Sequence, residues 1–501
     1  DTACQVRYRV AGTSNWSDGL DLWFDERNGG EYRGSIVYLT PDTTYEIQLS
    51  LMDIDTQIRF TATTWSETFD VWKTESLSFA ESASTLVIDE SGNPTDGYIL
   101  YEPGETDTID VNNTGDYCIK IDASYIIIDG LTLKNAKIHG ILLTENAHDV
   151  IIQNCDISGW GQEDPDPNIV GWGQNHNSAI YSQSENLERV IIQRNRIHSP
   201  EFDTNSWIES RVSDPDPGIS EFHPLGPQAI TLINSAGNHV IRFNEIYSGN
   251  GNYYNDIIGG GDNFSYQGSP HRDTDIYGNY LSNCWDDGIE AEGGNTNVRI
   301  WNNFIDETYV KIAVASTSTG PIYIWRNVAG VARQNDTQSW DNVPRGGFLK
   351  NGNVAPSGGK VYVFHNTILQ PPSSSQPDDN YTHGCSPGLG HGNSGAIHNV
   401  TSRNNILHLY RNGHNSINDQ VHDPLGDYDF DLYSGVIEAA SPEANGIHDL
   451  PLYDPTPTYS LVDGIGVFTL RSSSNPEVKD GYDDGELLDN FNDGYLGNAP
   501  D

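Results

Sequence analysis

The sequence predicts an all-β protein, built mainly as a right-handed parallel β-helix that follows a small antiparallel β-sandwich-like domain. Two observations predict the helix. A phrase of alternating apolar residues that ends near an asparagine recurs along the chain, and three copies begin 24 residues apart, at 274, 298 and 322. Glycine is abundant, with 50 residues among 501. No 3.6-residue apolar pattern accompanies it, which favours short strands joined by turns over helices.

The recurring phrase has the spacing of one β-helix coil. A repeat of this length suits three short strands and three bends, and it is too short for a four-stranded propeller blade. The right-handed crossover rule for parallel strands gives the expected hand. The recurring asparagine predicts an inward ladder, in which each side-chain amide bonds to the coils above and below. Its predicted members are Asn195, Asn279, Asn303, Asn327 and Asn366.

Residues 1–82 have a different pattern. Apolar and polar residues alternate in 6–10, 35–39 and 45–49, as in half-buried antiparallel strands. The segment 39–47 resembles the corner of a fibronectin type III domain, where an early tyrosine hydroxyl, here that of Tyr45, bonds back to the backbone. The resemblance implies a fibronectin type III-like domain over 1–82, with the β-helix over 83–501. The first two strands of such a sandwich have no counterpart, so this domain either begins inside the sandwich or is a half-sandwich resting on its neighbour.

Charge and cysteine content limit the classes of partner. The chain has 71 acidic and 26 basic residues, a net charge of −45, which repels nucleic acid and anionic membranes. No run of about 18 apolar residues suggests membrane insertion. The five cysteines are scattered without CxxC pairs, so we expect them to be small buried core residues rather than zinc ligands. A single disulfide among them remains an alternative. An extracellular location is expected, with any targeting segment removed or outside the numbering.

The densest acidic segment covers residues 284–295. Counting one 24-residue coil back from Asp286 leads to Asp262, and counting forward from Asp287 leads to Lys311. Stacked positions lie about 4.8 Å apart, so these carboxylates would crowd together. Such crowding requires a proton or a cation, and calcium suits oxygen ligands. A lysine beside the cluster could act as a base if burial lowered its pKa. The alternative is that Asp and Gly only form the coil bends and Lys311 neutralises them.

From about residue 90 the chain resembles the bacterial secreted right-handed parallel β-helix repeat proteins, and its acidic segment is similar to the site of polysaccharide lyase family nine. That similarity implies calcium as cofactor, held by Asp262, Asp286, Asp287 and Glu290, with Lys311 as the base. Two features depart from the family pattern. Glu290 stands where the family has aspartate, and Lys311 lacks the family's Gly-Phe-Lys-Leu-Gly context. Lys350 comes closer to that context and is a rival base.

The predicted function is calcium-dependent elimination on an extracellular, uronic-acid-containing polysaccharide. A glycoside hydrolase remains an alternative, with Glu290 or Glu292 paired with Asp286 or Asp287. A non-catalytic adhesin or fibre subunit is a second alternative, because solenoids have flat faces and open ends. The expected assembly is a monomer or an end-to-end stack. Candidate substrate contacts are the aromatic side chains of Trp285 and Tyr253, and the pair His271 and Arg272, which could hold a carboxylate or sulfate.

Overall fold

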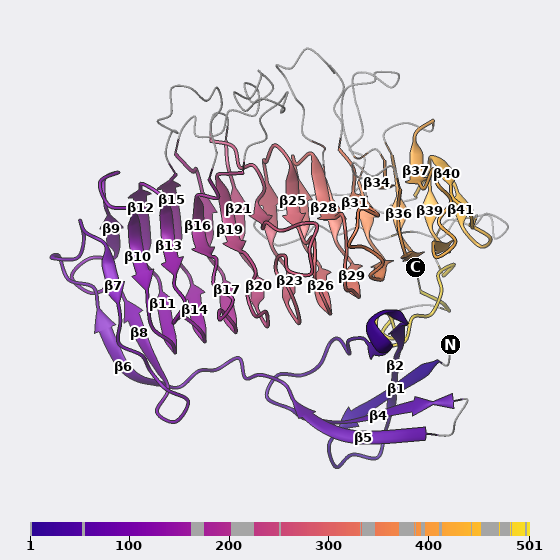
Figure 1. Ribbon diagram of the computed structural model, residues 1–501, viewed down its shortest axis with the longest axis horizontal. Helices are drawn as coiled ribbons and strands as arrows, with labels where there is room; N and C mark the ends of the chain where they lie inside the picture. Colours follow the sequence, from indigo (N-terminus) through magenta and orange to yellow (C-terminus); the bar gives the residue numbers. More distant parts are fainter. Residues whose placement is uncertain are drawn as a thin grey trace.

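The computed structural model describes residues 3–52, 56–161, 175–201, 225–249, 252–330, 332, 346–369, 385, 387–391, 396–409, 413–441, 443–451, 470, 481, 483–495 and 498–500. It confirms the predicted fold class. Three 12-stranded parallel sheets run side by side along one long axis, and an antiparallel sheet formed by the N-terminal residues lies beneath them (Figure 1). Among the described residues, no helix is long and apolar enough to cross a membrane.

Each parallel sheet takes one strand from every coil. The β25 sheet consists of β7 (Leu86–Ile88), β10 (Tyr117–Ile121), β13 (His139–Leu143), β16 (Ser178–Ser182), β19 (Gln228–Leu232), β22 (Ile258–Gly259), β25 (Asp287–Glu290), β28 (Val310–Val314), β31 (Leu349–Asn351), β34 (Leu389–His391), β37 (Asn415–Asn418) and β40 (Val436–Glu438). The β26 sheet consists of β6 (Val71–Ser76), β8 (Tyr98–Glu102), β11 (Ile126–Asp129), β14 (Val150–Gln153), β17 (Val190–Gln193), β20 (Val240–Arg242), β23 (Asp275–Tyr277), β26 (Val298–Trp301), β29 (Ile322–Trp325), β32 (Val361–Phe364), β35 (Val400–Arg403) and β38 (Asp427–Asp429). The β21 sheet consists of β9 (Thr108–Asp110), β12 (Thr132–Ala136), β15 (Asp156–Trp160), β18 (Arg196–His198), β21 (Glu245–Tyr247), β24 (Tyr280–Ser282), β27 (Phe304–Asp306), β30 (Val328–Ala329), β33 (Thr367–Ile368), β36 (Ile406–Leu407), β39 (Leu432–Tyr433) and β41 (Ile447–His448).

The three 24-residue repeats stack directly over one another. Ile276 pairs with Ile300, and Ile300 pairs with Ile324, so these side chains form a fully buried column. Burying an aliphatic side chain of this size contributes about 1.5–3 kcal/mol. Because every coil repeats the arrangement, the three sheets enclose one continuous apolar core along the solenoid.

The predicted asparagine ladder is confirmed. The Asn279 amide donates to Asn303 Oδ1 at 2.9 Å, and the Asn303 amide donates to Asn327 Oδ1 at 2.9 Å. Asn244 and Asn405 also belong to the ladder, which therefore runs through Asn195, Asn244, Asn279, Asn303, Asn327, Asn366 and Asn405. Each amide also donates to a backbone carbonyl of the preceding coil, so these buried polar groups are satisfied.

The cysteines are all buried and free, as predicted for small core residues. Cys118 and Cys155 belong to the apolar core of the helix. Burial raises the pKa of the Cys118 thiol to about 12, so this thiol stays protonated at neutral pH.

The N-terminal residues form a single antiparallel sheet in the order β3 (Glu31–Arg33), β2 (Ser17–Asp25), β1 (Cys4–Val10), β4 (Thr44–Leu51) and β5 (Thr56–Thr63), with a 3-10 turn at Arg27–Gly29. Thr40 donates its backbone N–H to the Tyr45 hydroxyl at 2.9 Å, the bond predicted for the corner. The parallel architecture begins with β6, which pairs with β8 and lies within the predicted residues 1–82.

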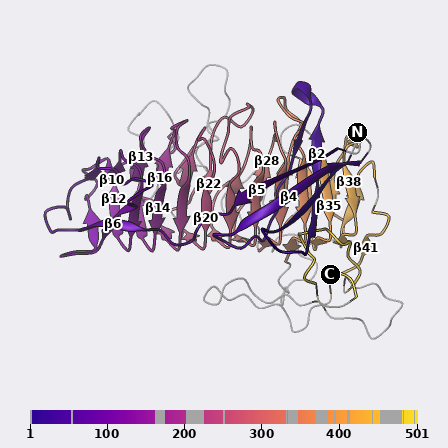
Figure 2. The same cartoon turned by 90° about the horizontal axis from the view of Figure 1, so that it is seen from below.

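The N-terminal sheet packs against the C-terminal half of the β-helix (Figures 1 and 2). Arg33 Nη1 donates to the carbonyl groups of Thr319 and Gly320 at 2.8 and 2.6 Å. Val37 packs into a buried cluster with Trp325 and Phe491. This packing corresponds to a half-sandwich that rests on its neighbour.

The asparagine ladder ends on an acidic pair, and this pair predicts a pH dependence of stability. Asn405 Nδ2 donates to Asp431 Oδ1 at 2.9 Å, and the Asp431 N–H donates to Glu443 at 3.2 Å. Burial and the charge of Asp431 raise the pKa of Glu443 from 4.5 to about 10. The folded chain therefore binds more protons than the unfolded chain between these two values, so this pair's contribution to stability falls as pH rises across that window.

We expect Glu443→Gln to increase the free energy of unfolding by about 2 kcal/mol at pH 8, since it removes the buried carboxyl that must otherwise stay protonated or repel Asp431. Below pH 4.5 the gain should vanish. Urea unfolding at several pH values measures the difference from the wild-type protein. The exposed Glu145→Gln is the matched control and should follow the wild-type curve. A pH slope that Glu443→Gln leaves unchanged would contradict the assignment.

Candidate functional site

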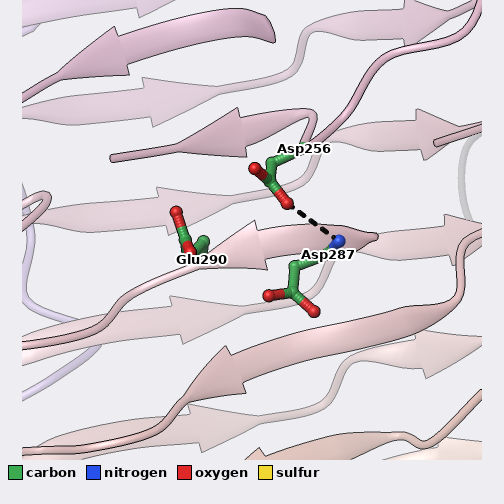
Figure 3. A group of neighbouring side chains, drawn as sticks. All are labelled: Asp256, Asp287 and Glu290. Carbon is green, nitrogen blue, oxygen red and sulfur yellow. Dashed lines mark hydrogen bonds between the residues drawn. The ribbon is translucent and has the colours of Figure 1, made fainter. Parts of the chain in front are cut away.

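An acidic group lies on the β25 sheet where β22 meets β25. Asp256, Asp287 and Glu290 each place one carboxylate oxygen within 4.8 Å of the others (Figure 3). Asp287 is fully buried and Asp256 is 4% exposed. Carboxylates that approach so closely repel one another unless a proton or a cation lies between them.

The backbone register explains which residues meet. Ile258 pairs with Ile289, so this coil has 31 residues rather than 24. Asp287 donates its backbone N–H to Asp256 Oδ1 at 3.0 Å, so Asp256 stacks on Asp287, and Asn255 takes the place beside Asp286 that was predicted for Asp262. The predicted stacking of Asp262 on Asp286 is therefore wrong. Asp262 is exposed in the loop after β22, where its side chain accepts a hydrogen bond from Asn234.

The carboxylates of Asp256 and Glu290 are each held by further hydrogen bonds. Asp256 Oδ2 accepts from Gln228 Nε2 at 3.2 Å and Asn255 Nδ2 at 2.8 Å. Glu290 accepts from the backbone N–H of Gly260 at 3.0 Å and from Asn263 Nδ2 at 2.7 Å. Asp286 belongs to the turn just before β25 and lies outside the group of three oxygens.

Asp287 has one paired and one unpaired oxygen. Its Oδ2 lies 2.6 Å from Lys350 Nζ, while its buried Oδ1 has no hydrogen-bond partner among the described residues. A buried acceptor without a partner costs about 1–3 kcal/mol, and a cation bound at this oxygen would remove that cost. Hard oxygen donors of this kind suit a calcium ion, and the residues present fit such a cation.

Lys350 and Glu292 extend the site beyond the acidic group. Lys350 Nζ lies 3.3 Å from Glu292 Oε1 and also binds Asp287. Its side chain is 24% exposed, whereas Glu292 is almost fully buried. Burial acts to lower the pKa of Lys350, but the charges of Asp287 and Glu292 outweigh it and raise this pKa well above its usual value. Lys350 is therefore an ammonium cation in this arrangement.

The two carboxyl groups beside Lys350 have raised pKa values. Burial raises the pKa of Asp287 strongly, and neighbouring Asp286 and Asp256 add to this effect against the opposing charge of Lys350. Burial raises the pKa of Glu292 to about 7. The ion pairs with Lys350 lower the pKa of both carboxyl groups, but by less than burial raises it. Carboxyl groups with raised pKa values are typical of functional sites.

Lys311 does not reach this site. The register places Val310, not Lys311, beside Asp287, so the predicted neighbour is wrong. Lys311 lies opposite Gly288, and a Cβ atom at Gly288 would meet the core residue Ile305. Lys311 is accordingly buried completely, with Nζ donating to the Thr308 carbonyl at 3.2 Å. It cannot contact a polysaccharide on the outer face.

The predicted substrate contacts lie in two places. Trp285 is almost fully buried, with its ring centroid 4.8 Å from that of Tyr253, just before β25. His271 and Arg272 lie in the turn into β23, where their side chains bind the carbonyl groups of Ser235 and Ala236. These contacts hold the coil corner.

Two residues near the acidic group were not predicted. Asp256 could have been found by aligning Asp256-Ile257-Ile258 with Asp287-Gly288-Ile289, in place of counting a constant coil length. The second is His176, which precedes β16. Burial lowers the pKa of His176, and the nearby charge of Glu290 opposes this effect. No sequence repeat marks this histidine, because it lies outside the strands.

Comparisons with known proteins are sparse. No protein-family model matches the sequence, and no curated protein matches it. Among solved structures, an alginate lyase from Paenibacillus sp. str. FPU-7 is similar with a TM-score of 0.34 and 13% identity, over 71% of this chain and 89% of that one. A TM-score this low supports no conclusion about activity.

Proposed function

We propose that this protein is an extracellular, calcium-dependent lyase that cleaves a uronic-acid-containing polysaccharide on the outer face of the β25 sheet. The observation that carries the proposal is the close group of buried Asp256, buried Asp287 and half-buried Glu290, with the unpaired Asp287 oxygen and Lys350 beside it. A chain with a net charge of −45 repels an acidic polymer, so binding needs a local positive charge. A cation and Lys350 would supply it together.

The residues of the site have separable roles in this proposal. Asp256, Asp287 and Glu290 would hold calcium, which when bound would attract the uronate carboxylate and acidify the neighbouring C–H. Elimination passes that proton to a base, here water, forms a carbon–carbon double bond and breaks the bond to the leaving sugar oxygen, which takes a proton from the Lys350 ammonium. Lys350 is an ammonium cation whose side chain is 24% exposed, so it would act as the acid that protonates the leaving oxygen. Glu292 contacts Lys350 from the buried side and sets its charge.

Glycoside hydrolysis is a second candidate, favoured by the carboxyl pair Asp287 and Glu292. Both contact the same Lys350 Nζ, so their oxygens lie no more than about 6 Å apart. Retaining glycosidases place two carboxyl groups about 5–5.5 Å apart, one of them with a raised pKa.

The discriminating experiment is incubation with polymannuronate, polyguluronate, polygalacturonate and neutral xylan, with and without a chelator. A lyase should produce unsaturated ends that absorb ultraviolet light from one of the uronates, and calcium should restore activity after chelation. New reducing ends without this absorbance would show a hydrolase. Absence of turnover on every polymer would leave the non-catalytic alternative.

Calcium binding should depend on Asp256 and Glu290 but not on Asp262. We expect Asp256→Asn and Glu290→Gln to abolish the heat of calcium binding in calorimetry, because each removes one of the crowded carboxylates. Calcium at 100 times its Kd should raise the stability of the wild-type protein by about 2.7 kcal/mol. Asp262→Asn is the matched control and should bind normally. Normal binding by Asp256→Asn would exclude the proposed ligand set.

A further inference from the structure

A second candidate binding site lies between the N-terminal sheet and the β26 sheet. Here a cavity of about 680 Å³ is lined on one side by residues 34–39 and 64–67. The other wall consists of side chains from β17, β20, β23, β26 and β29. Ligand sites typically occupy about 300–1,000 Å³ and favour interfaces between folding units. The acidic group lies on the β25 sheet, so this cavity is a separate feature.

Two arginines join the walls of the cavity. Arg299 forms a two-pronged ion pair with Asp275, at 2.9 and 2.8 Å, and its Nη1 donates to Ser35 Oγ at 3.1 Å. Arg242 pairs with Glu67 of the N-terminal segment and donates to the Tyr277 hydroxyl at 2.8 Å. The polar groups are thus held in place before any ligand arrives, which lowers the entropic cost of binding.

Aromatic side chains contribute the apolar part of the cavity. Trp65 is 43% exposed and Tyr38 is 48% exposed, although both line it. The Tyr38 ring meets Trp301 edge-on, with centroids 5.8 Å apart. The exposed rings offer flat apolar faces, and the fixed polar groups around them would set orientation.

The charge balance indicates the class of ligand. Arg242 and Arg299 face three lining carboxylates, those of Glu67, Asp273 and Asp275. This excess of negative charge disfavours a polyanion. Carboxylates accept hydrogen bonds only, so they suit ligands rich in hydroxyl donors. We propose that this cavity binds a neutral oligosaccharide and is a second, non-catalytic carbohydrate site. The proposal does not depend on which reaction the β25 sheet performs.

Calorimetry of the whole chain with cellohexaose, mannohexaose, xylohexaose and hexamannuronate tests this site. At least one neutral hexasaccharide should bind, and Asp287→Asn should bind it equally well because Asp287 lies on another sheet. Trp65→Ala should weaken binding about tenfold or more, since it removes an aromatic contact. Trp72→Ala is the matched control: Trp72 is 47% exposed but lies outside the cavity, and its loss should change nothing.

A variant that fills the cavity provides a second test of the proposal. Val240→Trp adds bulk to the cavity wall without removing a polar group, so it should abolish binding while the protein keeps its thermal unfolding transition. If that variant does not fold, Trp65→Ala decides the question alone. The proposal is overturned if no neutral hexasaccharide binds at millimolar concentration, if Trp65→Ala binds it as tightly as the wild-type protein does, or if hexamannuronate alone binds in the cavity.

Discussion

Lys350→Ala is expected to lower the rate of polysaccharide cleavage by about 10²–10⁴-fold, the range that proton transfer by a positioned side chain contributes. The variant leaves the buried carboxyl groups of Asp287 and Glu292 without their counter-charge, so it should be less stable than the wild-type protein, and its unfolding transition is measured beside its rate. Calcium affinity should be kept or increased, since Lys350 pairs with Asp287, a proposed calcium ligand. Cleavage assays combined with calorimetry would measure both effects.

Lys350→Arg separates proton transfer from charge. The guanidinium keeps the positive charge but does not lose a proton in proteins, so its rate should be nearly as low as that of the alanine variant. A substantial rate with arginine would show that Lys350 acts through charge alone. Lys311→Met is the control and should keep nearly the full rate, because Lys311 is enclosed in the core. Full activity of Lys350→Ala would exclude Lys350 from the reaction.

Asn303→Leu is expected to have the largest effect on stability, lowering the free energy of unfolding by about 4 kcal/mol or more. The substitution removes the acceptor of the Asn279 backbone and amide N–H groups, and the donor to the Ile276 carbonyl and Asn327 Oδ1. Each buried group left without a partner costs about 1–3 kcal/mol.

Urea unfolding followed by tryptophan fluorescence would measure the loss. The exposed Asn186→Leu is the matched control and should change stability by less than about 0.5 kcal/mol. A similar loss in both variants would indicate that leucine is poorly tolerated in the bends generally. A negligible loss in Asn303→Leu would show that the ladder contributes little beyond the apolar columns.

The solenoid could be predicted from the sequence alone, because a β-helix repeats one local pattern. The alternation around Ile276, Ile300 and Ile324 places the same side chains inward in every coil, and the asparagine after each phrase bonds to the asparagines of the adjacent coils and to a backbone carbonyl. Both features are local in sequence and recur, so composition and spacing suffice to predict them. Tyr45 and its bond to Thr40 are equally local.

The residues that meet in the site could not be predicted without the three-dimensional register. Coil lengths vary where loops are inserted, so a constant 24-residue step leads from Asp286 to Asp262 and from Asp287 to Lys311, whereas the backbone register brings Asp256 and Val310 beside Asp287. The register is set by stacking of the inward apolar residues, and a shift of one residue moves a side chain between core and surface. This one-residue difference buries Lys311, and Lys350, two coils from Asp287 along the same sheet, reaches it instead.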